Sequence, residues 1–284
     1  MTQLIEGKKV AKFLLDKLAE DIKNLDKKPS LAVIIVGDDP ASRIYVNLKK
    51  KKAFELGINS QVIEMPYETK QEDLLEKIEE LNNDKNINAI LVQLPLPNHM
   101  DKNIVLEKIT PLKDVDCFHP YNAGKISTGN KPYVYPCTPN GILKLLEYYN
   151  ISVEGKNVVV IGRSNIVGRP MAQMFVNKNA TVTICHSKTQ DLCSIARSAD
   201  ILVCAVGQRN LVTKDMVKKD AVVIDVGMNK NQDGKLCGDV DFANVKDIAS
   251  FITPVPGGVG PMTICSLMLN TYDLFNVQNN KSLQ

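Results

Sequence analysis

The sequence predicts an α/β protein with two lobes, and three features indicate this. With 284 residues, the chain is long enough for two domains, if a domain takes roughly 150 residues. Short β-branched runs alternate with amphipathic helical patterns in both halves, as in parallel sheets covered by helices. Hydrophobic residues make up 44% and charged residues 24% of the chain, which is the balance of a globular protein.

The first half predicts three strands, each followed by a helix. The strands are expected near 31–37, 61–65 and 89–94. Asp39 supplies an N-cap for the helix after the first strand, and Gly57 ends that helix. A capping box at 69–72 begins the second helix. A third helix is expected at 102–108, followed by an irregular stretch that reaches residue 136.

The second half begins with a helix at 138–149, which is expected to link the two lobes. Strands are then expected at 156–161, 180–185, 201–205 and 222–226. Prolines and glycines interrupt every register of 253–261, so this segment fits neither a strand nor a helix. A final helix is expected at 262–277.

Charge and cysteine usage exclude several classes of protein. The net charge of +3 is too small to indicate a nucleic-acid or membrane partner. The longest uncharged apolar run, at 89–97, is far shorter than the ~20 residues of a membrane span, and the charged amino terminus does not resemble a signal peptide. Seven cysteines without a C-x-x-C pair and three histidines predict a reduced, cytoplasmic protein without a metal site.

The turn from Gly162 to Gly168 lies between a predicted strand and a predicted helix. Backbone N–H groups at such a helix start can bind a pyrophosphate, although the spacing is not G-x-G-x-x-G and a turn without a ligand fits equally well. The next strand runs into His186 and Ser187, without the carboxylate that binds the ribose of NAD. Together with Arg163, this favours NADP. Taken singly, His186 and Arg163 also fit ordinary surface residues.

Three further candidates lie at strand ends or on a loop. Met228 follows the strand at 222–226, and ligands of parallel sheets lie at the carboxyl ends of strands; a single methionine is more often part of the core. Gln93 lies near the end of an apolar strand, where its amide either satisfies backbone groups or faces a cleft. Asp116 lies on a loop, where an ordinary turn aspartate is the alternative.

Tyr45 and Lys49 are four residues apart on the helix after the first strand, so they share one face. An aromatic ring beside an amine can stack on a flat ligand and offer it a proton acceptor. A lysine accepts a proton only if burial or neighbouring cations keep it uncharged, and Lys50 and Lys52 supply such charge. The alternative is that all four lysines of 49–52 lie on a solvated face.

Blocks of residues along almost the whole chain together resemble one family. They are YVNLK at 45–49, VQLPLP at 92–97, KDVD at 113–116, PCTPNG at 136–141, GRSNIVG at 162–168, CHS at 185–187, DVG at 225–227, GDVDF at 238–242 and TPVPGGVGPMT at 253–263. In these blocks the chain resembles the bifunctional methylenetetrahydrofolate dehydrogenase/methenyltetrahydrofolate cyclohydrolases. Because so many blocks occur in order, the resemblance does not depend on one motif.

The resemblance implies a folate-binding, catalytic domain at 1–138 and 265–284 and a Rossmann-like NADP-binding domain at 139–264. It further implies that folate lies in a cleft between the two lobes, that the final helix returns to the first lobe, and that the protein is a homodimer.

The resemblance also implies roles for individual residues. Lys49 is the catalytic lysine, Gln93 tunes it, Tyr45 stacks on the folate and Asp116 holds the pterin. The implied NADP contacts are Gly162, Arg163, Ser164, Ser187 and Met228, and the residues implied to border the bound substrate are Gly257 and Gly258.

Two residues depart from the family pattern. Cys117 stands where the family has glycine, and a side chain there costs about 1–2 kcal/mol if the backbone has a positive φ. Met228 replaces a residue that is usually β-branched.

The activity implied by the resemblance has two steps. NADP-dependent oxidation of 5,10-methylenetetrahydrofolate gives the 5,10-methenyl cation, and hydrolysis then gives 10-formyltetrahydrofolate for one-carbon metabolism and purine biosynthesis. The first step depends on orientation, whereas the second needs a proton acceptor, for which an uncharged Lys49 is expected. The alternatives are a dinucleotide-sensing subunit without activity and a dehydrogenase for another carbon–nitrogen bond. The joint presence of Tyr45, Lys49, Gln93 and Asp116 favours folate chemistry over both.

Overall fold

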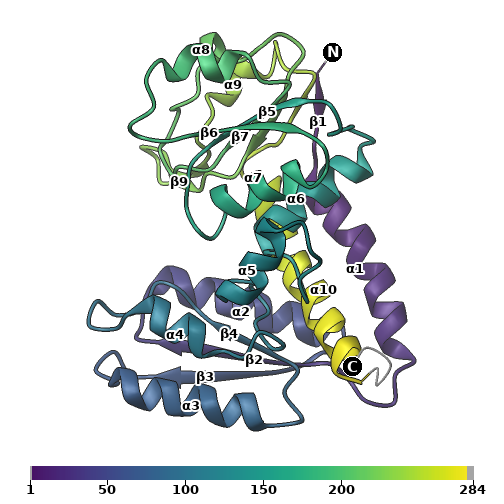
Figure 1. The fold of residues 1–284 in the computed structure, drawn as a ribbon, viewed down its shortest axis with the longest axis vertical. Helices are drawn as coiled ribbons and strands as arrows, with labels where there is room; N and C mark the ends of the chain where they lie inside the picture. Colours follow the sequence, from purple (N-terminus) through teal and green to yellow (C-terminus); the bar gives the residue numbers. More distant parts are fainter. Residues whose placement is uncertain (1, 280–284) are drawn as a thin grey trace. The chain divides into compact units, whose positions relative to one another are not determined.

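The computed structural model describes residues 2–279, which divide into two compact units. Unit 1 consists of Met1–Lys12 and Thr138–Thr263, and unit 2 consists of Phe13–Cys137 and Ile264–Gln284. Each unit has its own parallel sheet with helices around it (Figure 1), which confirms the predicted α/β class. Helices α1 (Gly7–Lys23) and α10 (Val259–Asn279) contribute residues to both units.

The amino terminus belongs to unit 1, together with the second half of the chain, whereas the expected boundaries placed it in one domain with residues up to 138. Strand β1 (Gln3–Leu4) pairs in parallel with β11 (Phe251–Ile252), and the N–H of Ile5 donates to the carbonyl of Ile252 at 2.8 Å. Residues 1–12 therefore fold with the second half of the chain, because β1 completes the edge of its sheet. A strand of two residues has no apolar periodicity from which this pairing could be predicted.

Unit 1 contains a six-stranded sheet in the order β1-β11-β8-β7-β5-β6. Its longer strands, all parallel, are β5 (Asn157–Ile161), β6 (Thr181–Cys185), β7 (Ile201–Cys204) and β8 (Val222–Asp225), as predicted. The chain passes from β5 outward to β6 and then returns to β7 on the other side of β5. Strand order thus reverses between β5 and β7, and the carboxyl ends of strands at such a point are where α/β sheets bind ligands.

The other elements of unit 1 surround this sheet. They are α6 (Cys137–Tyr148), α7 (Gly168–Val176), α8 (Leu192–Arg197), α9 (Phe242–Val245), the 3-10 helix η1 (Lys214–Met216) and the antiparallel hairpin of β9 (Asn229–Lys230) and β10 (Leu236–Cys237). The final helix, α10, begins three residues earlier than predicted, inside the segment at 253–261, so the expectation that this segment contains no helix is wrong for its last three residues.

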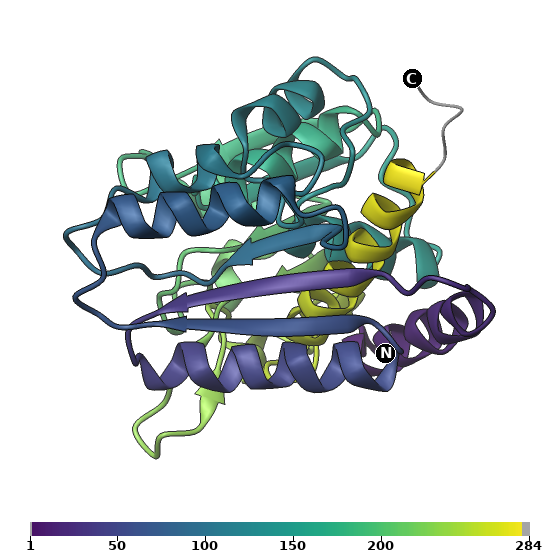
Figure 2. The same ribbon diagram turned by 90° about the horizontal axis from the view of Figure 1, so that it is seen from below.

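Unit 2 contains a three-stranded parallel sheet in the order β3-β2-β4, and Figure 2 shows these strands side by side. The strands are β2 (Ser30–Val36), β3 (Asn59–Met65) and β4 (Ala89–Val92), and the helices are α2 (Pro40–Glu55), α3 (Gln71–Asn83), α4 (Lys102–Lys108) and α5 (Pro120–Ser127). Helices α2 and α3 cover opposite faces of the sheet (Figure 1), as right-handed crossovers require for this strand order. Alternate residues of β2, among them Ala32 and Ile34, pack with Leu74 and Ile78 of α3 in one buried cluster.

The predicted helix ends are confirmed for α2. Asp39 Oδ2 accepts a 2.8 Å hydrogen bond from the N–H of Ser42, Pro40 is the first helical residue, and Gly57 adopts a positive φ of 73° just after the helix. These residues act locally, so the sequence pattern is sufficient to predict them.

Two predictions for unit 2 are wrong. The capping box at 69–72 does not form, since α3 begins at Gln71 with Lys70 as its N-cap, and the N–H of Thr69 donates to the carbonyl of Pro66 at 3.1 Å. The stretch expected to be irregular contains α5, which Pro120 begins while Nδ1 of His119 accepts a 3.0 Å bond from the N–H of Tyr121. A proline at the first helical position is a known start signal, and here it was missed.

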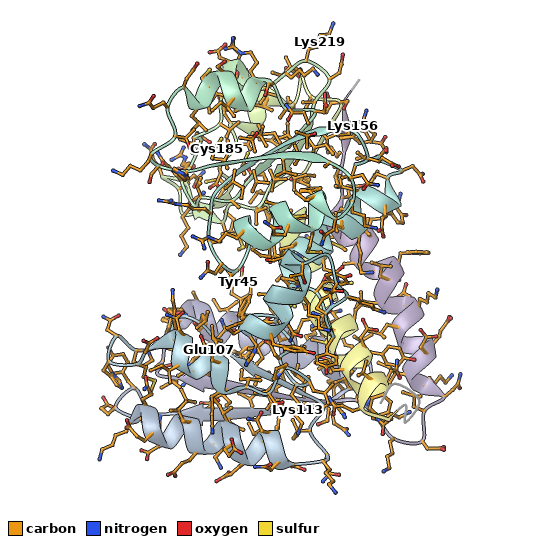
Figure 3. The ribbon with its side chains drawn as sticks, in the orientation of Figure 1. Tyr45, Glu107, Lys113, Lys156, Cys185 and Lys219 are labelled. Carbon is orange, nitrogen blue, oxygen red and sulfur yellow. The ribbon has the colours of Figure 1, made fainter. Side chains whose placement is uncertain are left out.

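The side chain of a buried lysine, Lys113, caps the carboxyl end of helix α3. Nζ of Lys113, labelled in Figure 3, donates to the carbonyls of Leu81 and Asp84 at 2.8 and 2.7 Å. The carbonyl of Leu81 has no partner within the helix, so Lys113 supplies the donor that it lacks, whereas the carbonyl of Asp84 also accepts from the N–H of Ile87 at 3.1 Å. Within residues 2–279, no helix is both long and apolar enough to cross a membrane.

Candidate functional site

Lys49 is directed at Gln93 rather than at solvent. Its amine, on α2, donates a 2.9 Å hydrogen bond to Oε1 of Gln93, which directly follows β4. Nε2 of Gln93 donates to the carbonyl of Leu94 at 2.7 Å, so the amide oxygen is the atom that faces the lysine. Lys49 and Gln93 are both partly buried, whereas Lys50 and Lys51 are exposed. The lysine run is therefore not one solvated face.

Asp116 belongs to the same site as Lys49. Burial raises the pKa of the Asp116 carboxyl above its ordinary value, although the positive charge of Lys49 and a hydrogen bond with the thiol of Cys137 both act to lower it. The charge of Lys49 acts on this pKa only because the two groups are close to each other. The aspartate is thus not an ordinary solvated turn residue.

Tyr45 lies one turn before Lys49 on α2 and is likewise partly buried. Burial raises the pKa of its phenol, and Figure 3 labels the side chain. The neighbouring Ile44 and Leu48 are exposed, so the face that carries Tyr45 and Lys49 is the inward one. This confirms the prediction that the two residues share a face.

The loop that carries Asp116 is held by Asp114, which the sequence analysis did not single out. The buried Asp114 carboxylate accepts hydrogen bonds from the N–H groups of Phe118 at 3.1 Å and His119 at 2.9 Å and from Nδ2 of Asn122 at 3.1 Å. Aspartates commonly bond backbone groups a few residues ahead in turns, so the signal was present in the sequence. Burial raises the pKa of Asp114 despite these bonds.

Cys117, directly after Asp116, has a positive φ of 61° and is buried. The condition under which a side chain is costly at this position is therefore met, and a cysteine occupies it. A residue with a Cβ pays for this conformation with about 1–2 kcal/mol.

Two further residues that the sequence analysis missed, Asn270 and Cys137, hold the backbone next to Asp116. Nδ2 of the buried Asn270, in the part of α10 that belongs to unit 2, donates to the carbonyls of Val115 and Tyr135, each at 2.8 Å. Sγ of Cys137 lies 3.6 Å from the carbonyl of Val115 and also bonds the Asp116 carboxylate. No local pattern signals these contacts, because Asn270 and Val115 are 155 residues apart.

A cavity of about 860 Å³ begins directly after Gln93 and is lined by residues 94–103. It lies just past the carboxyl end of β4, and none of the four candidate residues of unit 2 lines it. With Tyr45, Lys49, Gln93 and Asp116, unit 2 offers an aromatic ring, an amine, an amide and a carboxylate.

In unit 1, the turn that begins at Gly162 follows β5 and requires glycine there. Gly162 has a φ of 126°, and a Cβ at this position would lie 2.3 Å from the carbonyl oxygen of Ala205. Its N–H donates to the carbonyl of Cys185 at 2.9 Å, which keeps the turn beside the end of β6. Oγ of Ser164 accepts from the N–H of Gly168 at 3.4 Å, at the start of α7.

The end of β6 offers cations and hydroxyls and no carboxylate. Ser187 and Lys188 are exposed, and Nδ1 of His186 accepts a 3.1 Å bond from the N–H of Lys188, so these residues form a tight turn. Arg163 is also exposed, one residue past the glycine turn. This set fits the phosphorylated ribose of NADP, since an anion is stabilised by cations and hydroxyl donors.

The remaining predicted residues also lie in unit 1. Met228 follows β8 and is 49% exposed, so it is not part of the core. Gly257 and Gly258 directly precede α10, and the N–H of Lys8 donates to the carbonyl of Gly257 at 3.1 Å. These two glycines therefore belong to a different unit from Lys49 and Asp116.

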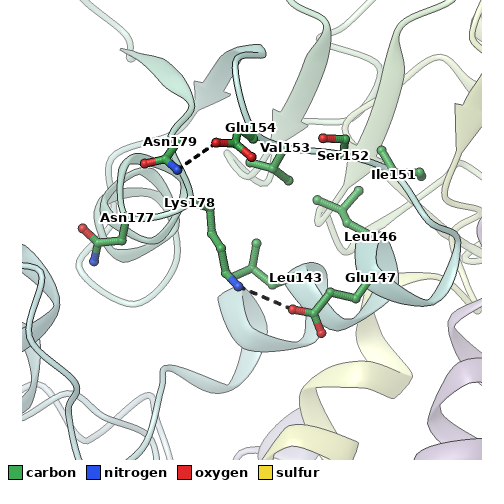
Figure 4. Close-up of a pocket in the computed structure, with 10 residues that line it drawn as sticks. All are labelled: Leu143, Leu146, Glu147, Ile151, Ser152, Val153, Glu154, Asn177, Lys178 and Asn179. Atoms are coloured by element: carbon green, nitrogen blue, oxygen red, sulfur yellow. Dashed lines mark hydrogen bonds and ion pairs between the residues drawn. The ribbon is translucent and has the colours of Figure 1, made fainter.

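A cavity of about 300 Å³ in unit 1 likewise contains none of the predicted residues (Figure 4). It lies beside Glu154, before β5 begins, and thus at the opposite edge of the sheet from the glycine turn. Glu147 pairs with Lys178 at 3.7 Å, and Asn179 donates to Glu154 at 3.2 Å. Its acidic and amide groups are already partnered.

Comparisons with known proteins give matches to both units. A family model for the tetrahydrofolate dehydrogenase/cyclohydrolase catalytic domain matches residues 5–116, and the model for the NAD(P)-binding domain of that family matches residues 136–279. The Bifunctional protein FolD of Bacillus cytotoxicus is 54% identical over 273 residues, which cover 95% of each chain.

Solved structures agree with these matches. The crystal structure of FolD from Campylobacter jejuni is 47% identical with a TM-score of 0.95, and the match covers 98% of this chain and 100% of that one. FolD of Trypanosoma brucei, complexed with NADP cofactor and an inhibitor, is 38% identical with a TM-score of 0.93, covering 98% and 99%.

Proposed function

Since the chain belongs to the tetrahydrofolate dehydrogenase/cyclohydrolase family, we propose that it carries out both reactions that the family name describes. It is a bifunctional enzyme of one-carbon folate metabolism that oxidises 5,10-methylenetetrahydrofolate with NADP and hydrolyses the 5,10-methenyl product to 10-formyltetrahydrofolate. The observation that carries this function is the 2.9 Å bond between Lys49 and Gln93 beside the Asp116 carboxylate.

The proposed roles in unit 2 follow from the chemistry of each side chain. Lys49 is the proton acceptor, Gln93 orients its amine, and Tyr45 stacks on the flat pterin. Asp116 accepts hydrogen bonds from the pterin's amino group and ring nitrogen, for which two carboxylate oxygens are suited.

For unit 1, we propose the NADP contacts Gly162, Arg163, Ser164, Ser187 and Met228. Backbone N–H groups of the glycine turn face the pyrophosphate, and Arg163 with Ser187 holds the 2′-phosphate. When bound, NADP supplies the hydride acceptor. Gly257 and Gly258 are the proposed border of the bound substrate.

The first reaction removes a hydride from the methylene carbon and leaves the methenyl cation. No proton moves in this step, so the side chains contribute by holding the reacting carbon in place. In comparable reactions such orientation lowers the activation barrier by at most about 7–11 kcal/mol. Tyr45 and Asp116 hold the pterin at its face and at its edge.

The second reaction needs a proton acceptor. Water adds to the methenyl carbon, and the amine of Lys49 accepts one of its two protons. Cleavage of the bond from this carbon to N5 then transfers the remaining hydroxyl proton to N5 and leaves the formyl group on N10. Only the uncharged amine can accept this proton. Gln93 is compatible with that state, because an amide oxygen accepts a hydrogen bond from a neutral amine as well as from an ammonium.

We also propose that the enzyme is a cytoplasmic homodimer whose product supports purine biosynthesis. Its seven cysteines are free thiols, which suits a reducing compartment. Sedimentation at micromolar concentration tests the dimer, and a monomer would contradict it.

The test of function begins with purified protein, 5,10-methylenetetrahydrofolate and NADP, with formation of the methenyl absorbance as the signal. Lys49→Met is expected to abolish hydrolysis of added methenyltetrahydrofolate while NADP binding is retained. The matched control is Lys51→Met, at an exposed lysine of the same run, which is expected to keep both activities.

Different outcomes separate the alternatives. Full hydrolysis by Lys49→Met would remove the lysine from the mechanism. No methenyl signal with NADP or NAD would favour a dinucleotide sensor over an enzyme, and oxidation of other carbon–nitrogen substrates alone would favour a different dehydrogenase.

A further inference from the structure

A buried carboxylate outside the predicted site, Asp239, joins the loops that follow two neighbouring strands of unit 1. Its side chain has no exposed surface. Oδ2 accepts hydrogen bonds from the N–H groups of Val206 at 2.8 Å and Gly207 at 3.1 Å, and Oδ1 accepts from Nδ2 of Asn229 at 2.9 Å. Val206 and Gly207 follow β7, and Asn229 lies beyond the end of β8.

These loops lie at the same edge of the sheet as the glycine turn. β7 is paired with β5 on one side and β8 on the other, and all three are parallel, so their carboxyl ends coincide. The pairing continues past the strands, since the N–H of Ala205 donates to the carbonyl of Ile161 and that of Val226 to Cys204, both at 2.8 Å. The loops anchored by Asp239 are thus part of the edge where strand order reverses.

The outward surface of these loops is apolar and accessible. Val206 is 39% exposed and Met228 is 49% exposed. Gly207 has a φ of 69°, and a Cβ added there would meet no atom within 4 Å. Asp239 bonds these loops from the buried side, so their outer side remains open to a ligand.

Asp239 is itself held by a second buried carboxylate, Asp225. Oδ1 and Oδ2 of Asp225 accept from the N–H groups of Asp239 and Val240, each at 2.9 Å. Glycine is required at position 238, because a Cβ there would lie 1.8 Å from Oδ2 of Asp225. The carbonyl of Asp239 also accepts from the N–H of Val212 at 3.0 Å. The position of the Asp239 carboxylate is therefore determined from several directions.

We propose that Asp239 is a positioning residue for NADP: it fixes the backbone of 206–207 and the side chain of Asn229, so that the cofactor meets a preformed surface. The inference rests on the proposed function. Burying a carboxylate costs free energy of desolvation that only its hydrogen bonds offset. All three hydrogen bonds that the Asp239 side chain accepts come from the loops at the carboxyl ends of β7 and β8. Ordering these loops in advance lowers the entropy that NADP binding would otherwise lose.

The test compares Asp239→Ala and Asp239→Asn by calorimetric titration with NADP. Asp239→Ala leaves the N–H groups of Val206 and Gly207 without their acceptor and is expected to weaken NADP binding about tenfold or more, a change of about 1.4 kcal/mol or more. Asp239→Asn is expected to be intermediate, because its amide oxygen still accepts from Val206 while the Asn229 amide turns to pair with its NH2 group.

Hydrolysis of added methenyltetrahydrofolate, which needs no NADP, is the second measurement. Lys49 and Gln93 belong to unit 2, so both Asp239 variants are expected to keep the hydrolysis rate of the unsubstituted protein. The matched control is Asp247→Ala, which removes an exposed carboxylate from unit 1 and is expected to leave the Kd for NADP unchanged.

An unchanged Kd in Asp239→Ala would overturn the inference. Equal losses of hydrolysis and NADP binding in Asp239→Asn would also overturn it, because they would assign Asp239 a role in folding only. If the unsubstituted protein binds NADP but does not oxidise methylenetetrahydrofolate, the proposed function fails while the role of Asp239 in binding stands.

Discussion

The amine of Lys49 and the amide oxygen of Gln93 are 2.9 Å apart, and they come from two different elements of unit 2, helix α2 and the end of strand β4. This pairing differs from an ion pair in one chemical respect. A carboxylate in place of the amide would favour the charged lysine, whereas an uncharged acceptor holds the amine in either state. The bond to Gln93 thus orients the lysine without itself favouring the charged form.

Replacing Gln93 by Glu tests this difference. The carboxylate would stabilise the ammonium, so the hydrolysis rate at neutral pH is expected to fall on the order of 10²-fold. The rate should partly recover as pH rises, because the amine then loses its proton. Gln93→Leu serves as control, since it removes the orienting bond without adding charge and should lower the rate without the new pH dependence. An unaltered rate and pH profile in Gln93→Glu would contradict the assigned role.

The positive φ of 61° at Cys117 leads to a stability prediction. At most buried positions, Gly destabilises a protein more than Ala does. At Cys117 the order should invert, with Cys117→Gly more stable than Cys117→Ala by about 1 kcal/mol, because only glycine adopts this conformation without strain. Urea unfolding of the two variants measures the difference. If the alanine variant were the more stable one, strain at this loop would be ruled out.

Asp225 predicts a pH dependence of stability. Burial raises its pKa from 3.8 to about 6, despite three accepted backbone hydrogen bonds, and the charge of Asp239 adds to the rise. Because the folded-state pKa is above the unfolded one, this group's contribution to stability is fully present below pH 3.8 and is lost as pH rises through about 6. The loss is on the order of 3 kcal/mol.

The Asp225→Asn variant cannot titrate at this position, so its free energy of unfolding should improve relative to the unsubstituted protein as pH rises from 3.8 to about 6, the two pKa values that bound the change. Denaturant unfolding at several pH values measures this relative slope. Asp233→Asn, at an exposed carboxylate in the hairpin of unit 1, is the control and should show no relative slope. Parallel pH profiles for Asp225→Asn and the unsubstituted protein would contradict the raised pKa.

Elements whose formation depends on residues close in sequence were predictable from the sequence. The buried apolar runs became β2, β4, β5, β7 and β8, and Asp39 caps α2 as expected. The prediction at 69–72 was wrong because α3 begins one residue later than a cap at Thr69 requires, and the N–H of Thr69 already donates to the carbonyl of Pro66. The pairing of β1 with β11 was missed because an edge strand of two residues is specified by its partner and not by its own pattern.

The same division holds for the candidate site. The sequence by itself determined that Tyr45 and Lys49 share a helix face, through their spacing, and that Gly162 begins a turn, through its own conformational freedom. Only the tertiary structure decided which distant residues hold the loops of the candidate site: Asn270 donates to the carbonyl of Val115, next to Asp116, and Asp239 accepts from the N–H of Val206. The physical reason is that a buried polar group must find a hydrogen-bond partner wherever the packed chain supplies one. That partner comes from a distant segment, and no local periodicity encodes it.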